Sequence, residues 1–108
     1  MKLPIELHAV THEPHDQILP RIADAIDAAD LRVLDVHLFS DLQAALLLEV
    51  TGPRFTRLGE HLAPLHVRLT DASVKTLASA PPDVEAASLE ITFAHGKGDL
   101  RRVVPAVP

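Results

Sequence analysis

The sequence predicts an α+β domain, and three observations support this prediction. The spacing of apolar residues switches repeatedly between every second position, as in strands, and every fourth position, as in amphipathic helices. Apolar residues form 47% of the chain and charged residues 23%, which is an ordinary globular balance. The length of 108 residues suits one hydrophobic core, so we expect a single domain.

The first half of the chain predicts three strands and a helix. Residues 3–10 place apolar side chains at every second position, which is typical of a strand with one face on a core. From Asp16, a good helix N-cap, isoleucines recur every fourth residue and indicate an amphipathic helix of about 14 residues. Residues 31–39 alternate again, and residues 44–50 are nearly all apolar, as in a strand at the centre of its sheet.

The second half predicts another helix, a strand and a hairpin. Pro53 suits a first helical position, Phe55, Leu58 and Leu62 would form the buried face, and Pro64 ends this second helix. Residues 65–70 then alternate as a strand, and residues 73–80 are long enough for two helical turns. Residues 88–104 predict a C-terminal β-hairpin, because two alternating segments flank a turn-like stretch that contains two glycines.

The order of the first six elements is strand, helix, strand, strand, helix, strand, which is the ferredoxin-like plan. Right-handed crossovers in this plan put two helices on one face of a four-stranded antiparallel sheet. We therefore expect a ferredoxin-like βαββαβ sandwich over residues 1–70, with residues 71–108 as a linker and hairpin extension of the same domain. The hairpin or a second subunit is expected to cover the other face of the sheet.

Composition and motifs disfavour several functional classes. The net charge of −5 argues against nucleic acid as a partner, and no apolar run approaches the about 20 residues of a membrane span. The absence of cysteine fits a cytoplasmic protein. No nucleophile-elbow motif occurs, and the carboxylates are spread along the predicted surfaces. We therefore expect a protein that is not an enzyme and uses no cofactor.

Four segments carry a resemblance to a known family: Ile18–Ile22, Ala29–Val36, Ala45–Val50 and Leu58–Leu62. In these apolar spacings the chain resembles the ACT domain, a small ligand-sensing module, in the forms found at phosphoserine phosphatase N-termini and in glycine-cleavage regulators. The resemblance covers about residues 3–70. It implies a regulatory domain that binds an amino acid or another small carboxylate at the interface of a homodimer.

The ligand site that we predict lies before the first helix, at Thr11, His12, His15, Asp16 and Gln17. The free N–H groups and positive dipole end of a helix N-terminus can hold a carboxylate. In the related domains a glycine precedes this helix and lets the backbone approach the ligand, whereas this chain has Gln17 at that position.

Two alternatives remain open from the sequence. The chain could be a structural or protein-interaction module that binds no small ligand. It could also bind Zn²⁺ or Ni²⁺ through His8, His12 and His15, since imidazoles so close in sequence can gather around one ion.

Overall fold

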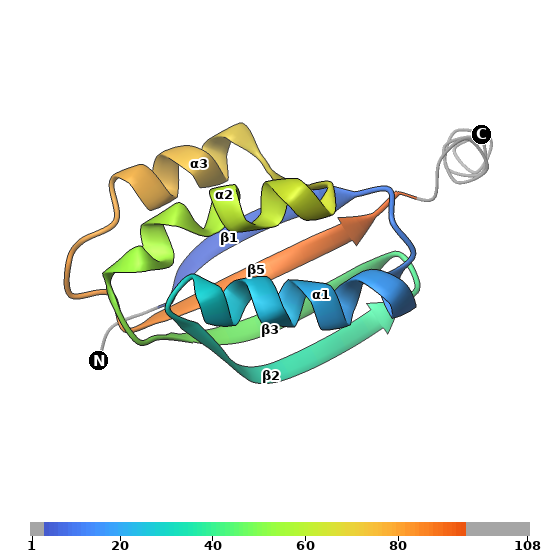
Figure 1. The fold of residues 1–108 in the computed structure, drawn as a ribbon, viewed down its shortest axis with the longest axis horizontal. Helices are drawn as coiled ribbons and strands as arrows, with labels where there is room; N and C mark the ends of the chain where they lie inside the picture. The colour runs from blue at the N-terminus through green and yellow to red at the C-terminus, as the bar shows by residue number, and fades with distance from the viewer. Residues whose placement is uncertain (1–3, 95–108) are drawn as a thin grey trace.

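A five-stranded sheet and three α-helices form the part of the chain that the structure describes, which is residues 4–94 of a computed structural model (Figure 1). Two short 3₁₀ turns, η1 and η2, flank the second helix. The elements follow one another as β1 (Ile5–Thr11), α1 (His15–Ala28), β2 (Leu31–Ser40), β3 (Gln43–Val50), η1 (Pro53–Arg57), α2 (Leu58–Leu62), η2 (Ala63–Leu65), β4 (Val67–Leu69), α3 (Asp71–Ala78) and β5 (Ala86–Phe93). The α+β prediction is confirmed. No helix among these residues is long and apolar enough to cross a membrane.

The sheet is mixed, and its strand order is β2-β3-β5-β1-β4. Strand β5 runs parallel to β1, whereas the other three pairings are antiparallel. The predicted four-stranded antiparallel sheet is therefore wrong at its centre, where β5 separates β1 from β3. The strand directions of the ferredoxin-like plan are kept, because β1 remains antiparallel to β3 across the inserted strand.

Strand β5 has a neighbour on both edges, which bears on the predicted hairpin. Residues 87–93 pair with β1, and residues 86–92 pair with β3. The second segment of that hairpin lies outside the described residues. Because both edges of β5 are occupied, a hairpin partner has no free edge of β5 to pair with.

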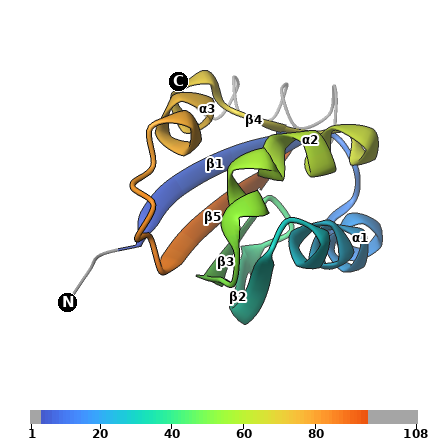
Figure 2. The same cartoon turned by 60° about the vertical axis from the view of Figure 1, so that its left-hand side comes forward.

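Helices α1 and α2 lie on one face of the sheet, and α3 packs beside the edge of β1 (Figure 2). One core cluster joins the buried side of every strand to residues from each helix, such as Ile22 of α1, Leu62 of α2 and Leu77 of α3. The alternating pattern of β5 gives this strand one buried face. Leu89 and Ile91 are buried in the core, whereas Glu90 between them points to the other face of the sheet. That other face is not covered within residues 4–94.

The helix boundaries differ from the predictions for local reasons. Helix α1 is preceded by Pro14 rather than capped by Asp16, and the carbonyl of Pro14 accepts hydrogen bonds from the N–H groups of Gln17 and Ile18. The predicted second helix contains only five α-helical residues between the two 3₁₀ turns. Strand β4 starts at Val67 because His66 has a left-handed backbone with φ of 63°.

Ser73 closes the edge of β1 beyond the end of β4. Its hydroxyl accepts the N–H of His8 at 2.7 Å and the hydroxyl proton of Thr70 at 2.9 Å, and Ser73 is buried. Thr70 is also the N-cap of α3 and accepts the backbone N–H of Ser73. These contacts attach α3 to the sheet. They also give the N–H of His8, which points outward from the β1 edge, a hydrogen-bond partner.

An ion pair joins the turn after α1 to the turn after β3. The carboxylate of Asp30 accepts hydrogen bonds from the backbone N–H, Nε and an Nη atom of Arg54, at 3.0, 3.2 and 3.1 Å. These bonds lower the pKa of Asp30, chiefly through the Arg54 side chain. Gly52 is required beside this pair, because a Cβ atom there would lie 2.6 Å from a carboxylate oxygen of Asp30.

The lowered pKa predicts a loss of stability in acid. A carboxyl group whose pKa is lower in the folded chain stabilises the fold above its ordinary value of about 3.9, and this contribution disappears as pH falls through the lower folded value. We expect the urea midpoint of the Asp30→Asn variant to depend less on pH than that of the native chain between about pH 5 and pH 2. The matched variant Asp24→Asn, on the exposed side of α1, should keep the native acid dependence. Identical acid profiles for the native chain and Asp30→Asn would contradict this role.

Candidate functional site

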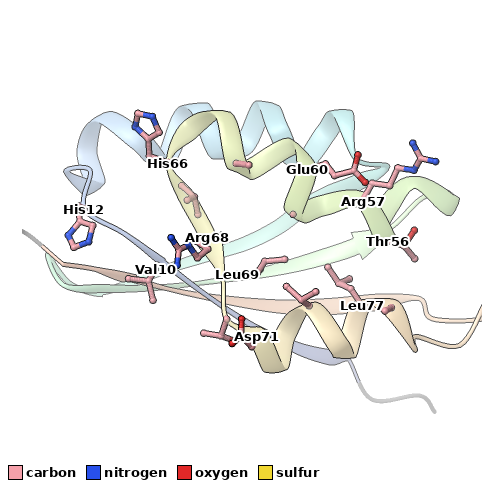
Figure 3. A pocket seen from close by; sticks show the side chains of 16 residues that line it. Val10, His12, Thr56, Arg57, Glu60, His66, Arg68, Leu69, Asp71 and Leu77 are labelled. Atoms are coloured by element: carbon pink, nitrogen blue, oxygen red, sulfur yellow. The ribbon is translucent and has the colours of Figure 1, made fainter.

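A groove of about 1020 Å³ lies along β4, between α2 on one side and α3 on the other (Figure 3). Helix α2 and the turn η1 before it contribute Arg57 and Glu60, and α3 contributes Asp71 and Leu77. His12 and Arg68 lie toward one end of the groove, and Arg57 lies toward the other (Figure 3).

The floor of the groove includes the free edge of β4. The N–H of Thr70 bonds to the carbonyl of His8, so every second residue of β4, starting from Thr70, points its backbone groups toward β1. Val67 and Leu69 fall between these positions, and their N–H and C=O groups therefore point away from β1 into the open edge. The groove thus offers backbone donors and acceptors beside its side chains.

Charged side chains of both signs line the groove. Arg57, Arg68, Glu60 and Asp71 form no ion pair or side-chain hydrogen bond with any residue between 4 and 94. Apolar side chains, including Leu69, lie between them. A polar molecule that carries both a positive and a negative group would find partners for each along one surface.

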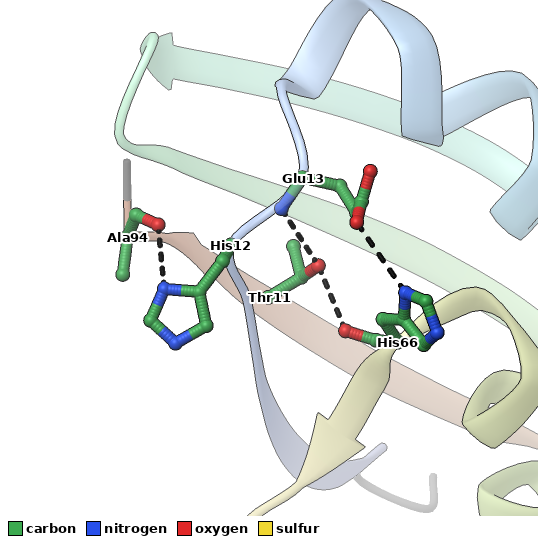
Figure 4. Close-up of polar contacts among 5 residues, drawn as sticks. All are labelled: Thr11, His12, Glu13, His66 and Ala94. Atoms are coloured by element: carbon green, nitrogen blue, oxygen red, sulfur yellow. Dashed lines mark hydrogen bonds and ion pairs between the residues drawn. The ribbon is translucent and has the colours of Figure 1, made fainter. Parts of the chain in front are cut away.

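The end of the groove where His12 and Arg68 lie is here called the basic end. A set of hydrogen bonds holds the chain segments at this end in place (Figure 4). The Thr11 hydroxyl is buried and donates to the carbonyl of His66 at 2.9 Å, and it accepts the N–H of Glu13 at 3.1 Å. The Glu13 carboxylate lies 3.4 Å from Nδ1 of His66. His12 lies 2.9 Å, through Nδ1, from the carbonyl of Ala94. Three separate segments of the chain are fixed to one another here.

These contacts determine which ring nitrogen of His12 and of His66 carries the proton. A carbonyl or carboxylate oxygen can only accept, so Nδ1 of both His12 and His66 is the donor. The Nε2 atoms have no partner within the described residues. With Nδ1 as the donor, the Nε2 atom of each neutral ring is a hydrogen-bond acceptor.

The five residues predicted as a ligand site occupy different places. Only His12 lines the groove, and Thr11 is buried beneath the groove's basic end. His15 packs with its ring edge against Phe93, at 5.8 Å between centroids. Asp16 and Gln17 are exposed on the first turn of α1. A single ligand site formed by these five residues stays a prediction.

The three histidines predicted as metal ligands do not converge. His8 lies on the open face of the sheet, where its Nδ1 is 3.2 Å from a carboxylate oxygen of Glu90. His12 and His15 have the separate contacts described above. Within residues 4–94, no three histidine, aspartate or glutamate side chains lie close enough to share an ion. The described fold does not form the predicted metal site.

Replacing Thr11 with valine tests the hydrogen bonds behind the groove. Valine keeps the shape but leaves the partly buried N–H of Glu13 and the carbonyl of His66 without this partner, so we expect Thr11→Val to lower the free energy of unfolding by about 1–3 kcal/mol. The measurement is denaturation in urea. Thr92→Val is the matched control, since Thr92 is exposed on the open face of β5, and its stability should change by less than about 0.5 kcal/mol. Equal effects of the two substitutions would contradict the role of Thr11.

Sequence reasoning missed most of the residues that line the groove. Arg57, Arg68 and Asp71 belong to different elements and share no motif, so their spacing in the sequence does not group them into one site. Their only signal in the sequence is the short interval between Pro53 and Asp71, in which four elements of the fold (η1, α2, η2 and β4) follow one another before α3 begins.

Comparison with known proteins adds no assignment to this geometry. No protein-family model, no curated protein and no solved structure matches the chain. Membership of the ACT family therefore stays a prediction, carried by the apolar spacings alone.

Proposed function

We propose that this chain is a small regulatory domain that binds an amino acid, or another small carboxylate, in the groove between α2 and α3. The observation that carries the proposal is the presence of unpaired groups of both signs along one apolar surface. A free amino acid has the complementary pattern, with a carboxylate and an ammonium group beside a side chain.

The basic end of the groove suits the carboxylate. The guanidinium of Arg68 is permanently charged and can offer two parallel N–H donors to a carboxylate. The outward N–H groups of Val67 and Leu69 supply further donors for a bound anion.

The acidic residues suit the ammonium group. Asp71 begins α3 and Glu60 lies on α2, so the two carboxylates approach the groove from opposite sides (Figure 3). The apolar side chains between them, such as Leu69 and Leu77, can contact the remaining part of the ligand. A ligand that contacts both α2 and α3 would favour one spacing of these helices, which is how binding would regulate an attached or neighbouring protein.

The proposal is tested by thermal melting with a panel of amino acids and small dicarboxylates. A ligand that binds the folded chain raises the free energy of unfolding by about 2.7 kcal/mol at a concentration one hundred times its Kd. For a domain of this size, that corresponds to a rise in Tm of more than about 10 °C. The absence of a shift with every compound would contradict the proposal.

A substitution in the groove distinguishes specific binding from a general salt effect. Arg68→Ala removes the proposed carboxylate partner and should abolish the rise in Tm, whereas Arg21→Ala removes an exposed arginine from α1 and should leave the rise unchanged. If both variants respond to ligand as the native chain does, the site lies elsewhere.

The other features expected from the sequence stay predictions. They are the homodimer, the cytoplasmic location and the absence of enzymatic activity. The alternative of a protein-interaction module is favoured by one observation, the exposed apolar side chains along β2.

A further inference from the structure

The free edge of β4 carries more backbone groups than one amino acid can use. The N–H and C=O groups of Val67 and Leu69 point away from β1, and we call these four groups the β4 edge. Both residues line the groove, so a bound molecule can reach the edge. The ammonium and carboxylate groups of a free amino acid are attached to the same Cα atom and lie about 2.5 Å apart, so they can pair with only one residue of the edge.

Charges of opposite sign lie at the two ends of the β4 edge (Figure 3). Thr11 pairs with Val67, which places His12 and the basic end of the groove beside the start of β4. Asp71 follows the end of β4, four extended residues or about 13 Å beyond Val67. Arg68 and Asp71 form no ion pair with any residue between 4 and 94. The groove therefore has one unpaired charge for each end of a ligand longer than an amino acid.

We propose that the groove binds a free peptide of three residues, which adds to the β4 edge as an antiparallel strand. The inference rests on the proposed function, because both place a carboxylate at the basic end. The third peptide residue lies opposite Val67, whose N–H donates to the terminal carboxylate and whose C=O accepts the N–H of that residue. The first peptide residue lies opposite Leu69, whose N–H donates to its carbonyl and whose C=O accepts from its ammonium group.

The charges at the two ends determine the direction of the peptide. An antiparallel peptide places its carboxylate beside Arg68 and its ammonium group toward Asp71. A parallel peptide would bring its carboxylate toward that of Asp71, where the two negative charges repel. Antiparallel pairing is also the more stable of the two arrangements. Three extended residues span about 10 Å, which carries the ammonium group from the basic end to the neighbourhood of Asp71.

The size and walls of the groove suit a peptide of this length. Its volume of about 1020 Å³ lies just above the range of about 300–1,000 Å³ that is typical of pockets for drug-sized ligands. Val74 of α3 lines the groove and is 52% exposed, so an apolar side chain of the peptide can cover it. In peptide recognition by strand addition, backbone hydrogen bonds supply affinity and contacts of this kind supply specificity.

NMR titration of the full chain with alanine and with trialanine tests the proposal. Alanine compounds are the probes because the inference concerns backbone and terminal groups. Trialanine should bind at least about tenfold more tightly than alanine, since it forms further hydrogen bonds with the β4 edge. Trialanine that binds no more tightly than alanine, or does not bind, would overturn the inference. The panel of amino acids and dicarboxylates tests the proposed function separately and can succeed where trialanine fails.

Methylation of single peptide nitrogens tests the strand pairing. A methyl group on the nitrogen of the third residue removes the donor to the C=O of Val67 and should weaken binding at least about threefold. The N–H of the second residue points away from β4 in this arrangement, so methylation there is the matched control and should change the Kd less than about twofold. Equal effects of the two methyl groups would contradict the pairing.

Amide hydrogen exchange locates the peptide on the protein. Saturating trialanine should slow the exchange of the amides of Val67 and Leu69 at least about fivefold, because both become hydrogen-bond donors to the peptide. The amide of Arg68 points to β1 and should not change. Unchanged exchange at Val67 and Leu69 would overturn the proposal.

A substitution at Asp71 tests the direction of the peptide. Asp71→Asn removes the charge that faces the ammonium group and should weaken trialanine binding about two- to fivefold, as expected for an exposed ion pair. Asp24→Asn, on the exposed side of α1, makes the same change of charge and should leave the Kd unchanged. Equal Kd values for the native and Asp71→Asn chains would contradict the proposed direction.

Discussion

A chain that ends at Glu85 is expected to be unfolded, whereas a chain that ends at Ala94 should fold. The difference between them is β5, the strand that pairs with both β1 and β3. Without β5, the pair β2–β3 and the pair β1–β4 have no hydrogen bonds to one another. Two-stranded units of this kind are marginally stable at best in water.

The energy of the buried side chains of β5 points the same way. Leu89, Ile91 and Phe93 are at most 1% exposed, and burial of each contributes about 1.5–3 kcal/mol. Their sum of about 5–9 kcal/mol is as large as the net stability of many domains, which is about 5–15 kcal/mol. Removal of β5 therefore removes most or all of the margin that keeps the chain folded.

Circular dichroism, followed during thermal melting of the two truncated chains, measures whether each of them unfolds cooperatively. The chain ending at Ala94 should show a cooperative transition, and the chain ending at Glu85 should show none. A cooperative transition in the shorter chain would mean that the sheet does not need β5 to fold, and would contradict this prediction.

Replacement of Phe93 by alanine should lower the free energy of unfolding by about 3–5 kcal/mol. Phe93 is 1% exposed in the main core, and its ring also meets the ring of His15 at the start of α1. Alanine leaves a cavity where the sheet and helix meet, because the surrounding backbone is fixed by pairing on both sides of β5. Urea denaturation measures the loss, which corresponds to a fall in Tm of more than about 12 °C.

A conservative substitution separates lost volume from lost aromatic contact. Phe93→Leu keeps most of the apolar volume, so its loss should be less than half that of Phe93→Ala. A change below about 1 kcal/mol for Phe93→Ala would contradict the placement of this ring in the core.

The type and position of most elements could be predicted from periodicity. The strands expected near residues 3–10, 31–39 and 44–50 correspond to β1, β2 and β3 within a few residues. The sequence allows two helical turns over residues 73–80, and α3 occupies Asp71–Ala78. These assignments succeed because the alternation of buried and exposed side chains is imposed directly by the backbone geometry of a strand or helix.

The order of strands in the sheet could not be predicted in the same way. In β5, Leu89 and Ile91 alternate with Ser88 and Glu90, which is typical of a strand with one solvent-exposed face. That alternation reports which face of the sheet is buried, but it does not report which strands lie on either side. The central position of β5 depends on pairing with residues more than forty positions away, such as Leu46.

The candidate site was predicted only in part, for a related reason. His12 could be singled out because it precedes a helix in the sequence. Arg57, Arg68 and Asp71 line one groove with His12 only when β4 pairs with β1. Local spacing identifies residues that lie on one turn of chain, and a groove formed by separate elements leaves no such spacing in the sequence.

The central place of the last described strand has a consequence for how the chain folds. Ile5 pairs with Ala87, so the middle of the sheet joins residues from nearly opposite ends of the described chain. Contacts between such distant residues slow folding, because a long loop must close before they form. On the ribosome, β1 through β4 emerge before their common partner has been synthesised. The domain must therefore acquire its structure late, after translation of β5, and the exposed apolar strands before that moment are candidates for chaperone binding.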